Sequence, residues 1–441
     1  MQGELESKIN DRTAVVGIMG LGYVGLPLAL SFAKEFKVIG FDVSKQTISV
    51  LLKGESHIGD IKDEQVALTL NKSFFPTTDP KRLRECDAII ICVPTPLRPN
   101  KEPDLSYIRS AAETVKESLK QNMLVVLEST TYPGTTENVL QPILEKTGLR
   151  VGKDFFLAFS PERIDPGNKN FHVTDIPKIV GGIEPQSTLL ASALYSSIIK
   201  KVCHVRNART AEAVKMMENV FRNVNIALVN EMALIFERLD IDAWEVIDAA
   251  KTKPFGFMPF YPGPGIGGHC IPLDPLYMSY ISKRSGYTPR FIEMASEIND
   301  FMKLHAVNLL ERALVLNGIS MADSTICVLG LAYKKDVGDA RETPSTKIIE
   351  EILERGAGVK AYDPFVKSIS TSTQTIHSEA HIEEAAKGCE AILILMNHEE
   401  FLKTDYLHLA SLLKHPIIVD CKNVLKPMDG IFYFGLGKPN K

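Results

Sequence analysis

The sequence predicts an α/β protein in which two doubly wound parallel sheets are joined by a central helical region with one long helix. Three observations support this fold class. Short β-branched apolar runs alternate with amphipathic stretches over about the first 200 residues and again after about residue 320, which is typical of parallel strands with crossover helices. Between them, Thr210 to Leu239 contains neither glycine nor proline and repeats apolar residues at helical spacing. A chain of 441 residues is also long enough for two or three domains.

The strands are expected in ten short apolar runs. Those of the first sheet are 14–20, 37–42, 86–94, 123–129, 155–162 and 178–182, and those of the second are 324–334, 358–364, 390–401 and 415–425. Two runs of the second sheet echo the first, because "VKAYDP" resembles "VIGFDV" and "CEAILILMNHE" resembles "CDAIIICVPTP". We therefore expect domains at 1–205, 206–305 and 306–441.

The long helix carries a polar stripe. At about 1.5 Å per residue it would be about 45 Å long, enough to join two domains and to bury one face against a partner chain. Lys215, Asn219, Asn223 and Asn230 lie close to one face of it. A solvated face is one explanation, but asparagine is a poor residue for an exposed helix surface. The alternative is functional, since a lysine and an asparagine one turn apart can together stabilise an oxyanion.

Composition and charge argue against several classes of protein. Hydrophobic residues make up 45% and charged residues 24%, and the net charge of −4 offers no electrostatic footprint for nucleic acid. No basic block suggests a membrane surface, and we see neither a signal-peptide core nor an apolar run that could cross a bilayer. The seven cysteines include no CxxC pair, which favours free thiols in a reducing cytoplasm. The histidines form no zinc-type cluster, and we expect no metal.

A glycine loop follows the first expected strand. Its sequence, Gly20-Leu21-Gly22-Tyr23-Val24-Gly25, is GxGxxG between a strand and a helix, where Gly20 permits a tight turn, Gly22 admits a pyrophosphate and Gly25 allows close packing. Asp42 ends the next strand. Its carboxylate can bind ribose hydroxyls and would repel a 2′-phosphate, which favours NAD over NADP. The alternative is that Asp42 is only a turn residue. Thr95 follows the third strand and either faces the cofactor or forms a turn between two prolines.

A second glycine-rich stretch, "GPGIGGHC" at 263–270, ends on a cysteine. Such a loop can present the thiol of Cys270 to a ligand, although a free cysteine can also be a small buried hydrophobe. Beside an NAD site, a presented thiol suggests oxidation of an aldehyde through a covalent thiohemiacetal. Release of the resulting thioester needs an activated water, for which Asp274 and Glu162 are candidate bases, and either can instead be structural.

The chain resembles the UDP-glucose/GDP-mannose dehydrogenase family from about residue 14 to its last strands. The motifs that carry the resemblance are "GLGYVGLP", "STTYPGTTE", "SPERIDPG", "AEAVKMMEN", "YPGPGIGGHCIPLDP" and "GLAYKKDVGDARETPS", in the family's order. The resemblance implies four-electron, NAD-dependent oxidation of the C6 alcohol of a nucleotide sugar to a carboxylate. It also implies an N-terminal NAD-binding Rossmann domain, a central helical dimerisation region and a C-terminal Rossmann-like domain that binds the UDP-sugar.

Residue roles follow from the same motifs. Cys270 resembles the nucleophile, and Lys215 and Asn219 resemble the pair that stabilises the oxygen anion. Asp274 resembles a carboxylate that positions water or tunes the thiol, and Glu162 resembles the group that assists hydrolysis. A hydroxyl of "STTYPGTT" belongs beside Glu162, either Thr130 or Thr131, and the commoner spacing favours Thr130. The expected substrate contacts also include Arg163, Tyr261, Gly263, Gly265, Gly267, Gly268 and Lys334, and Arg341 is expected near the cofactor.

Two departures bear on the substrate. The chain has "PERIDPG" where UDP-glucose enzymes carry a "PEFLxEG"-like segment, and its cysteine loop contains His269 and Pro272. Both features resemble members that oxidise UDP-N-acetylhexosamines for surface polysaccharides. UDP-N-acetylglucosamine is the first expectation, followed by UDP-N-acetylgalactosamine and UDP-N-acetylmannosamine, with UDP-glucose as an alternative. A two-electron dehydrogenase with a structural cysteine and a binding protein without turnover are the rival hypotheses. We expect a homodimer or a higher homo-oligomer.

Overall fold

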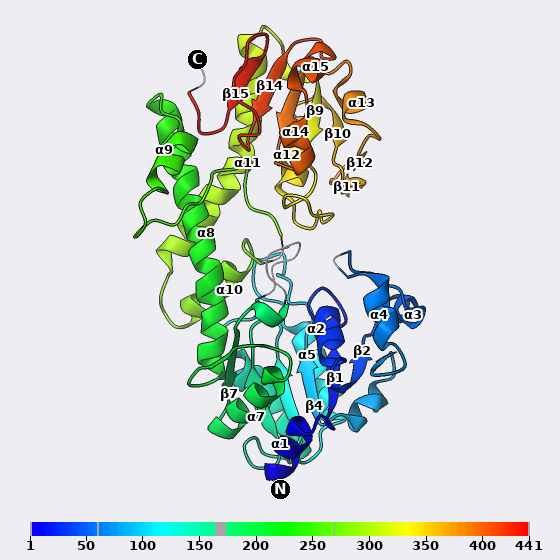
Figure 1. Cartoon of the computed structure of the whole chain (residues 1–441). Helices are drawn as coiled ribbons and strands as arrows, with labels where there is room; N and C mark the ends of the chain where they lie inside the picture. The colour runs from blue at the N-terminus through cyan, green and yellow to red at the C-terminus, as the bar shows by residue number, and fades with distance from the viewer. Residues whose placement is uncertain (1, 60, 164–172, 269, 440–441) are drawn as a thin grey trace. The chain divides into compact units, whose positions relative to one another are not determined.

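A computed structural model describes residues 2–59, 61–163, 173–268 and 270–439. Its contacts divide the chain into two compact units, and each is described by itself (Figure 1). Unit 1 comprises Met1–Glu218 with Leu276–Thr288, and unit 2 comprises Asn219–Pro275 with Pro289–Lys441. His269 and residues 164–167 of the "SPERIDPG" motif lie outside the described residues.

Unit 1 is built on an eight-stranded sheet with the order β3-β2-β1-β4-β5-β6-β7-β8. The strands are β1 Val15–Met19, β2 Lys37–Phe41, β3 Phe74–Thr77, β4 Ala88–Ile91, β5 Leu124–Leu127, β6 Phe156–Phe159, β7 Lys178–Gly182 and β8 Val202–His204. The six expected strands are confirmed, whereas β3 and β8 were not predicted. The expectation of an all-parallel sheet is wrong at one place, because β7 runs antiparallel to β6. The described part of their connection holds one 3-10 turn, Val173–Asp175, and no crossover helix of the kind that parallel strands usually need.

Helices cover both faces of this sheet. They are α1 Gln2–Asn10, α2 Gly25–Phe32, α3 Lys45–Leu52, α4 Asp63–Thr69, α5 Ser106–Lys116, α6 Gln141–Leu144 and α7 Pro185–Ser196. Successive residues of one strand face opposite sides, so Ile90 packs in the core cluster that contains α2 while Ile91 packs in the cluster that contains α5. Burial on both faces explains why the strands are continuous apolar runs.

The predicted long helix is confirmed as α8, Ala208–Arg238, and its polar stripe is buried. Lys215, Asn219, Asn223 and Asn230 are all less than one-tenth exposed, so the explanation of a solvated face is wrong. Three apolar residues are instead exposed: Met217 is 67%, Phe221 42% and Leu228 52% exposed. The helix therefore turns its polar stripe into the protein and leaves part of an apolar face exposed, although the Phe221 ring contacts that of Phe260 with centroids 5.9 Å apart.

Unit 2 contains a five-stranded parallel sheet with the order β10-β9-β13-β14-β15. Its strands are β9 Thr325–Leu329, β10 Gly358–Tyr362, β13 Ala391–Ile394, β14 Ile417–Asp420 and β15 Phe432–Gly435, and β11 Ser368–Ser370 pairs with β12 Thr375–His377 in a separate hairpin. The helices of this unit after α8 are α9 Ala243–Ala250, α11 Arg290–Leu316, α12 Pro344–Glu354, α13 Ile382–Ala386, α14 Glu399–Lys403 and α15 Tyr406–Ser411, whereas α10 Asp274–Arg284 belongs to unit 1 from Leu276 onward. The four expected strands are confirmed, and β15 and the hairpin were not predicted.

The weak internal resemblance in the sequence corresponds to a repeated turn. Gly20 and Gly330 both have positive φ, +90° and +104°, and each amide donates to the last residue of the neighbouring strand. The next amide then donates to an aspartate just beyond that strand, Asp42 at 2.8 Å in unit 1 and Asp363 at 2.7 Å in unit 2. The order β2-β1-β4-β5 in unit 1 matches β10-β9-β13-β14 in unit 2.

The two turns differ at their third residue. Gly22 in unit 1 is exposed, whereas Ala332 in unit 2 is buried and its amide donates to Asp363 at 2.8 Å. The amides of the second turn therefore form hydrogen bonds within the protein. The first turn differs, because its glycine is open to a phosphate.

Candidate active site

The first glycine loop joins β1 to α2, and each of its glycines has a separate structural reason. A Cβ on Gly20 would lie 2.6 Å from the Cys92 carbonyl oxygen, and one on Gly25 would lie 1.7 Å from the Gly20 carbonyl oxygen. Both positions therefore exclude larger residues. A Cβ on Gly22 would meet nothing within 4 Å. The space above Gly22 is thus open to a ligand, and the loop leads into the N-terminus of α2, where backbone amides favour an anion.

Asp42 both forms the turn and leaves capacity for a ligand. Its two carboxylate oxygens accept from the amides of Leu21 and Ser44, each at 2.8 Å. A carboxylate has about four lone-pair sites, so a ribose hydroxyl can still bind. Tyr23 and Val24 are half-buried beside the loop. The half-buried Thr95 follows β4, and its carbonyl accepts from the Tyr277 hydroxyl, which supports the turn interpretation for its backbone.

The two candidate threonines differ in accessibility. The side chain of Thr131 is buried, and its hydroxyl lies 2.7 Å from that of Thr135 within the turn. Thr130 is half-buried. Thr130 is therefore the one of the two that is more open to a ligand.

Glu212 on α8 holds this turn in place, and our reading of the sequence missed it. Its buried carboxylate accepts from the Gly134 amide at 2.5 Å and from the amide and hydroxyl of Thr136 at 2.8 and 2.7 Å. Burial raises the pKa of Glu212 to about 7. The only signal in the sequence is its place three residues before Lys215 in "AEAVK".

Glu162 and Lys215 meet in unit 1. Glu162 is buried, its Oε1 accepts from the Arg163 amide at 2.6 Å, and its backbone carbonyl accepts from Lys215 Nζ at 2.5 Å. Arg163 in turn pairs with Glu218 at 2.7 Å. A lysine on α8 and a carboxylate beyond β6 thus share one small region.

Asn219, Cys270 and Asp274 lie together in unit 2. Asn219 Nδ2 donates to Asp274 Oδ2, and the Asp274 amide donates to the Cys270 carbonyl at 2.9 Å. Cys270 is exposed, whereas the other six cysteines are buried or half-buried. The side chain of Asp274 is therefore occupied with orienting Asn219, and Cys270 is the most accessible thiol of the chain.

The glycines of the cysteine loop are required by its conformation and its packing. Gly265 and Gly268 have φ of +110° and +84°. A Cβ on Gly267 would lie 2.7 Å from the Tyr333 Cβ, and one on Gly268 would lie 2.8 Å from the Tyr333 ring. The loop thus lies against the segment that follows β9.

Asparagines of the buried stripe hold both ends of this loop. The Gly263 amide donates to Asn230 Oδ1 at 3.0 Å, and Asn223 Nδ2 donates to the Ile271 carbonyl at 3.3 Å. Asn299 on α11 accepts from Asn230 Nδ2 at 2.9 Å. The stripe therefore positions the loop that carries Cys270.

The other predicted contacts of unit 2 have partners of their own. Tyr261 stacks on Trp244 with ring centroids 5.5 Å apart, and its hydroxyl donates to Asp248 at 2.6 Å. Arg341 pairs with Asp339 at 2.6 Å, and Lys334 is half-buried. The structure therefore anchors Tyr261 and Arg341 within unit 2.

Lys422 is a further candidate that our reading of the sequence missed. It follows β14 at the carboxyl edge of the sheet, and its Nζ lies 3.0 Å from the position of a Cβ on Gly263. Among the described residues its ammonium has no ion-pair or hydrogen-bond partner, and burial lowers its pKa. A half-buried cation beside the glycine loop suits an anionic group such as a phosphate. A lysine directly beyond a buried strand, in "VDCKNVL", was the available signal.

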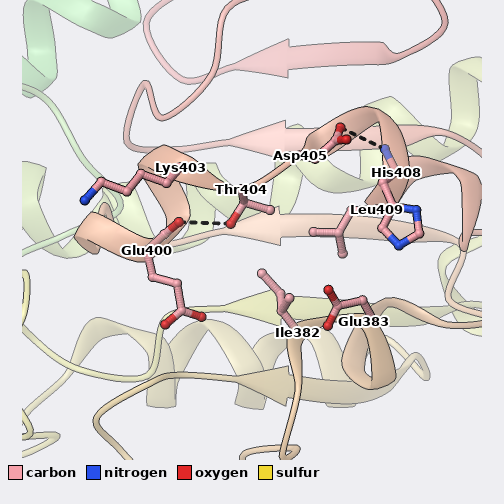
Figure 2. Close-up of a pocket in the computed structure, with 8 residues that line it drawn as sticks. All are labelled: Ile382, Glu383, Glu400, Lys403, Thr404, Asp405, His408 and Leu409. Atoms are coloured by element: carbon pink, nitrogen blue, oxygen red, sulfur yellow. Dashed lines mark hydrogen bonds between the residues drawn. The ribbon is translucent and has the colours of Figure 1, made fainter.

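A cavity in unit 2 is lined by none of these residues. It has a volume of about 280 Å³ and is bounded by α13, α14 and α15 (Figure 2). Two polar groups on its wall are occupied, since Asp405 caps α15 through the His408 amide at 3.1 Å and Thr404 donates to the Glu400 carbonyl at 3.0 Å. We assign it no part in the candidate site.

Within the described ranges, no helix is both long and apolar enough to span a bilayer. In the same part of the chain, no three metal-ligating side chains come together.

The fold and the site define a class of protein. A doubly wound sheet with an open glycine loop and a following aspartate, together with a second sheet of related order, is the architecture of a dinucleotide-dependent dehydrogenase with two Rossmann-like domains. Comparison with known proteins then assigns the family. The chain belongs to the UDP-glucose/GDP-mannose dehydrogenase family, whose NAD binding domain matches residues 14–199, central domain residues 209–301 and UDP binding domain residues 327–427.

Individual relatives agree over nearly the full length. A UDP-N-acetyl-D-mannosamine dehydrogenase of Pyrococcus horikoshii is 37% identical over 96% of this chain and 99% of its own. A UDP-N-acetyl-D-glucosamine 6-dehydrogenase of Pseudomonas aeruginosa is 37% identical over 88% of this chain and 91% of its own. The solved structure of a UDP-D-ManNAc dehydrogenase from Pyrococcus horikoshii superposes with a TM-score of 0.89 at 36% identity, over 97% of this chain and 100% of that one. The protein is thus an NAD-dependent UDP-sugar dehydrogenase, and the predictions of fold class, enzyme class and cofactor are confirmed.

Proposed function

We propose that the protein oxidises the C6 alcohol of a UDP-N-acetylhexosamine to the uronic acid in two steps, with Cys270 as the covalent nucleophile. The observation that carries the proposal is the exposed thiol at the end of a glycine loop that asparagines hold at both ends. The names of the two relatives at 37% identity support the substrate class, since both act on UDP-N-acetylhexosamines. These relatives differ in the epimer, and we retain UDP-N-acetylglucosamine as the first substrate to test.

Each group of the chain has one proposed task. The first glycine loop, Gly20 to Gly25, and Asp42 would hold NAD, which would supply the hydride acceptor for each of the two oxidations. The Cys270 thiolate adds to the aldehyde left by the first oxidation, and Lys215 and Asn219 stabilise the oxygen anion by charge and hydrogen bonding. After the second oxidation the sugar is a thioester. A water assisted by Glu162 and Thr130 attacks its carbonyl carbon, the carbon–sulfur bond breaks, and the thiolate of Cys270 leaves.

We assign the UDP group to unit 2. Lys334 and Lys422 are the proposed partners of the diphosphate, and Gly263 to Gly268 follow the sugar. The position of the Lys422 ammonium beside Gly263 supports this assignment, because a phosphate would supply the partner that it lacks among the described residues. Asp274 keeps Asn219 oriented through their hydrogen bond, and Arg341 is proposed to lie near the cofactor.

Counting NADH tests the chemistry. Against a panel of UDP-sugars, two NADH per uronate formed would support the thioester route, and one NADH per product would support a two-electron dehydrogenase with a structural cysteine. Cys270→Ser should stop acid formation. Glu162→Gln should accumulate an acyl adduct on Cys270 that intact-mass spectrometry detects. Full turnover to the acid by Cys270→Ser would show the nucleophile assignment to be wrong.

We also propose a homodimer that uses the exposed apolar face of α8, because Met217 and Leu228 are each more than half exposed. The proposed domains remain 1–205, 206–305 and 306–441. Seven free cysteines favour the cytoplasm as the site of action, and surface polysaccharide precursors are the proposed use of the product.

A further inference from the structure

The antiparallel strand β7 brings an unpredicted lysine to the candidate site. In the β6–β7 register Ala158 lies opposite Gly182, and Phe159 lies opposite Gly181. Continued in the same sense, this register sets Glu162 opposite Lys178, the first residue of β7. A parallel β7 would have begun at the other end of β6. The one departure from the parallel sheet therefore places Lys178 beside Glu162.

Lys178 lies between two buried carboxylates. Its Nζ pairs with Glu128, which follows β5, and lies 3.6 Å from Glu162 Oε2. All three residues are buried, each less than one-tenth exposed as a whole. The Tyr195 hydroxyl donates at 2.7 Å to Glu128 Oε1, the same oxygen that pairs with the lysine, and the Tyr195 ring centroid lies 5.1 Å from the lysine Nζ. Charges at this depth interact strongly because little water screens them.

Other charged and titratable groups face the cluster from neighbouring elements. Cys92, beyond β4, approaches Glu128 Oε2 at 3.7 Å. Lys215 on α8 donates to the backbone carbonyl of Glu162, and the Arg163 guanidinium is paired with Glu218. The thiol is held neutral, because burial and the nearby carboxylates raise the pKa of Cys92 well above its usual value. Lys178 is thus the cation in direct contact with both buried carboxylates.

The cluster holds two carboxyl groups for one ammonium. Burial opposes the charge of Lys178, yet Glu128 and Glu162 together raise its pKa, so the lysine stays protonated. Burial raises the pKa of Glu128 in spite of the lysine. A cavity of about 10 Å³, lined by Glu162 and Lys178 among others, adjoins the pair and is about large enough for one water.

We propose that Lys178 is a positioning residue for the hydrolytic half of the reaction, in which its ammonium, shared with Glu128, pairs with the Glu162 carboxylate and orients it toward a water. The proposal rests on the function proposed above for Glu162. In the step concerned, the water oxygen bonds to the thioester carbonyl carbon as its proton passes to Glu162. The carbon–sulfur bond breaks, and the electron pair returns to the sulfur of Cys270.

The test measures hydrolysis of the thioester against pH in the full-length enzyme. One turnover is started with NAD and the UDP-sugar that the panel selects, quenched at intervals, and the acyl adduct is followed by intact mass. Two variants act on the lysine from opposite sides. In Lys178→Met, Glu162 loses its neighbouring cation, and the acid limb of the hydrolysis profile should move to higher pH by about one unit. In Glu128→Gln the Lys178 ammonium pairs with Glu162 alone, and the acid limb of the hydrolysis profile should move to lower pH.

Opposite shifts support the proposal, because a general loss of structure would not move the limb in two directions. Unmoved limbs, or two shifts of the same sign, overturn it. Lys178→Arg keeps the charge and should restore the wild-type limb. If Lys178→Met does not fold, the shift of Glu128→Gln to lower pH decides alone. Glu162→Gln separates the proposed function of Glu162 from the proposed role of Lys178. Normal hydrolysis in Glu162→Gln refutes the function of Glu162 itself. A trapped thioester in Glu162→Gln, together with an unmoved acid limb in Lys178→Met, refutes only the role of Lys178.

Discussion

Glu212 makes the turn that carries Thr130 sensitive to pH. The folded protein raises the pKa of this buried carboxyl from an ordinary value of 4.5 to about 7. The folded state therefore binds the proton more tightly than the unfolded state does. The stabilisation is complete below pH 4.5 and is lost as the pH rises through 7. A difference of about 2.5 units, at about 1.4 kcal/mol per unit, is worth about 3 kcal/mol of unfolding free energy between pH 5 and 8.

The variant Glu212→Gln isolates this contribution. Its amide oxygen can still accept from Thr136, but its NH₂ group faces the Gly134 amide, which adds a penalty of about 1–3 kcal/mol that does not depend on pH. We expect the stability of the wild type relative to this variant to fall by about 3 kcal/mol from pH 5 to pH 8. Urea unfolding of both full-length proteins at constant ionic strength measures the difference, and hydrogen exchange at Gly134 and Thr136 reports the turn itself. A difference that is constant with pH, or that grows as the pH rises, would refute the reasoning.

Three further predictions follow from the geometry. Gly22→Ala should leave the thermal midpoint within a degree or two yet weaken NAD binding at least about tenfold, whereas Gly25→Ala should lower the midpoint; equal melting of the two variants would contradict this. Lys422→Met should weaken binding of UDP in calorimetry about tenfold while NAD affinity is kept, and Lys422→Arg should recover most of it; unchanged UDP affinity would remove the lysine from the site. Iodoacetamide should label Cys270 first, with UDP-sugar protecting it, and peptide mapping that finds another cysteine first would contradict its exposure.

Much of the fold was readable from local patterns. The apolar runs of β1 and β13 and the uninterrupted helical spacing of α8 are properties of short stretches of chain, and the structure confirms them. Short strands such as β3 and β8 escaped because four or three residues carry too little periodicity to stand out. Among the residues singled out from the sequence, the structure brings Glu162 and Lys215 together, and Asn219 and Asp274 together.

The residues that were missed are those whose partners are distant in sequence. Lys178 and Glu128 are separated by 50 positions and Glu212 and Gly134 by 78, and no motif joins them. In the sequence Lys422 looks like an ordinary surface lysine, and only the fold of unit 2 places it beside Gly263. Their significance depends on burial and charge, which a sequence pattern does not contain.

The sequence by itself determined the two strand–helix halves, the long helix between them, the open glycine loop and the cysteine at the end of its own glycine loop, because periodicity and glycine placement act over a few residues. Only the tertiary structure decided which way β7 runs and which face of α8 is buried. Strand direction and helix burial are set by long-range packing, and they are what bring a lysine and two carboxylates into one desolvated cluster.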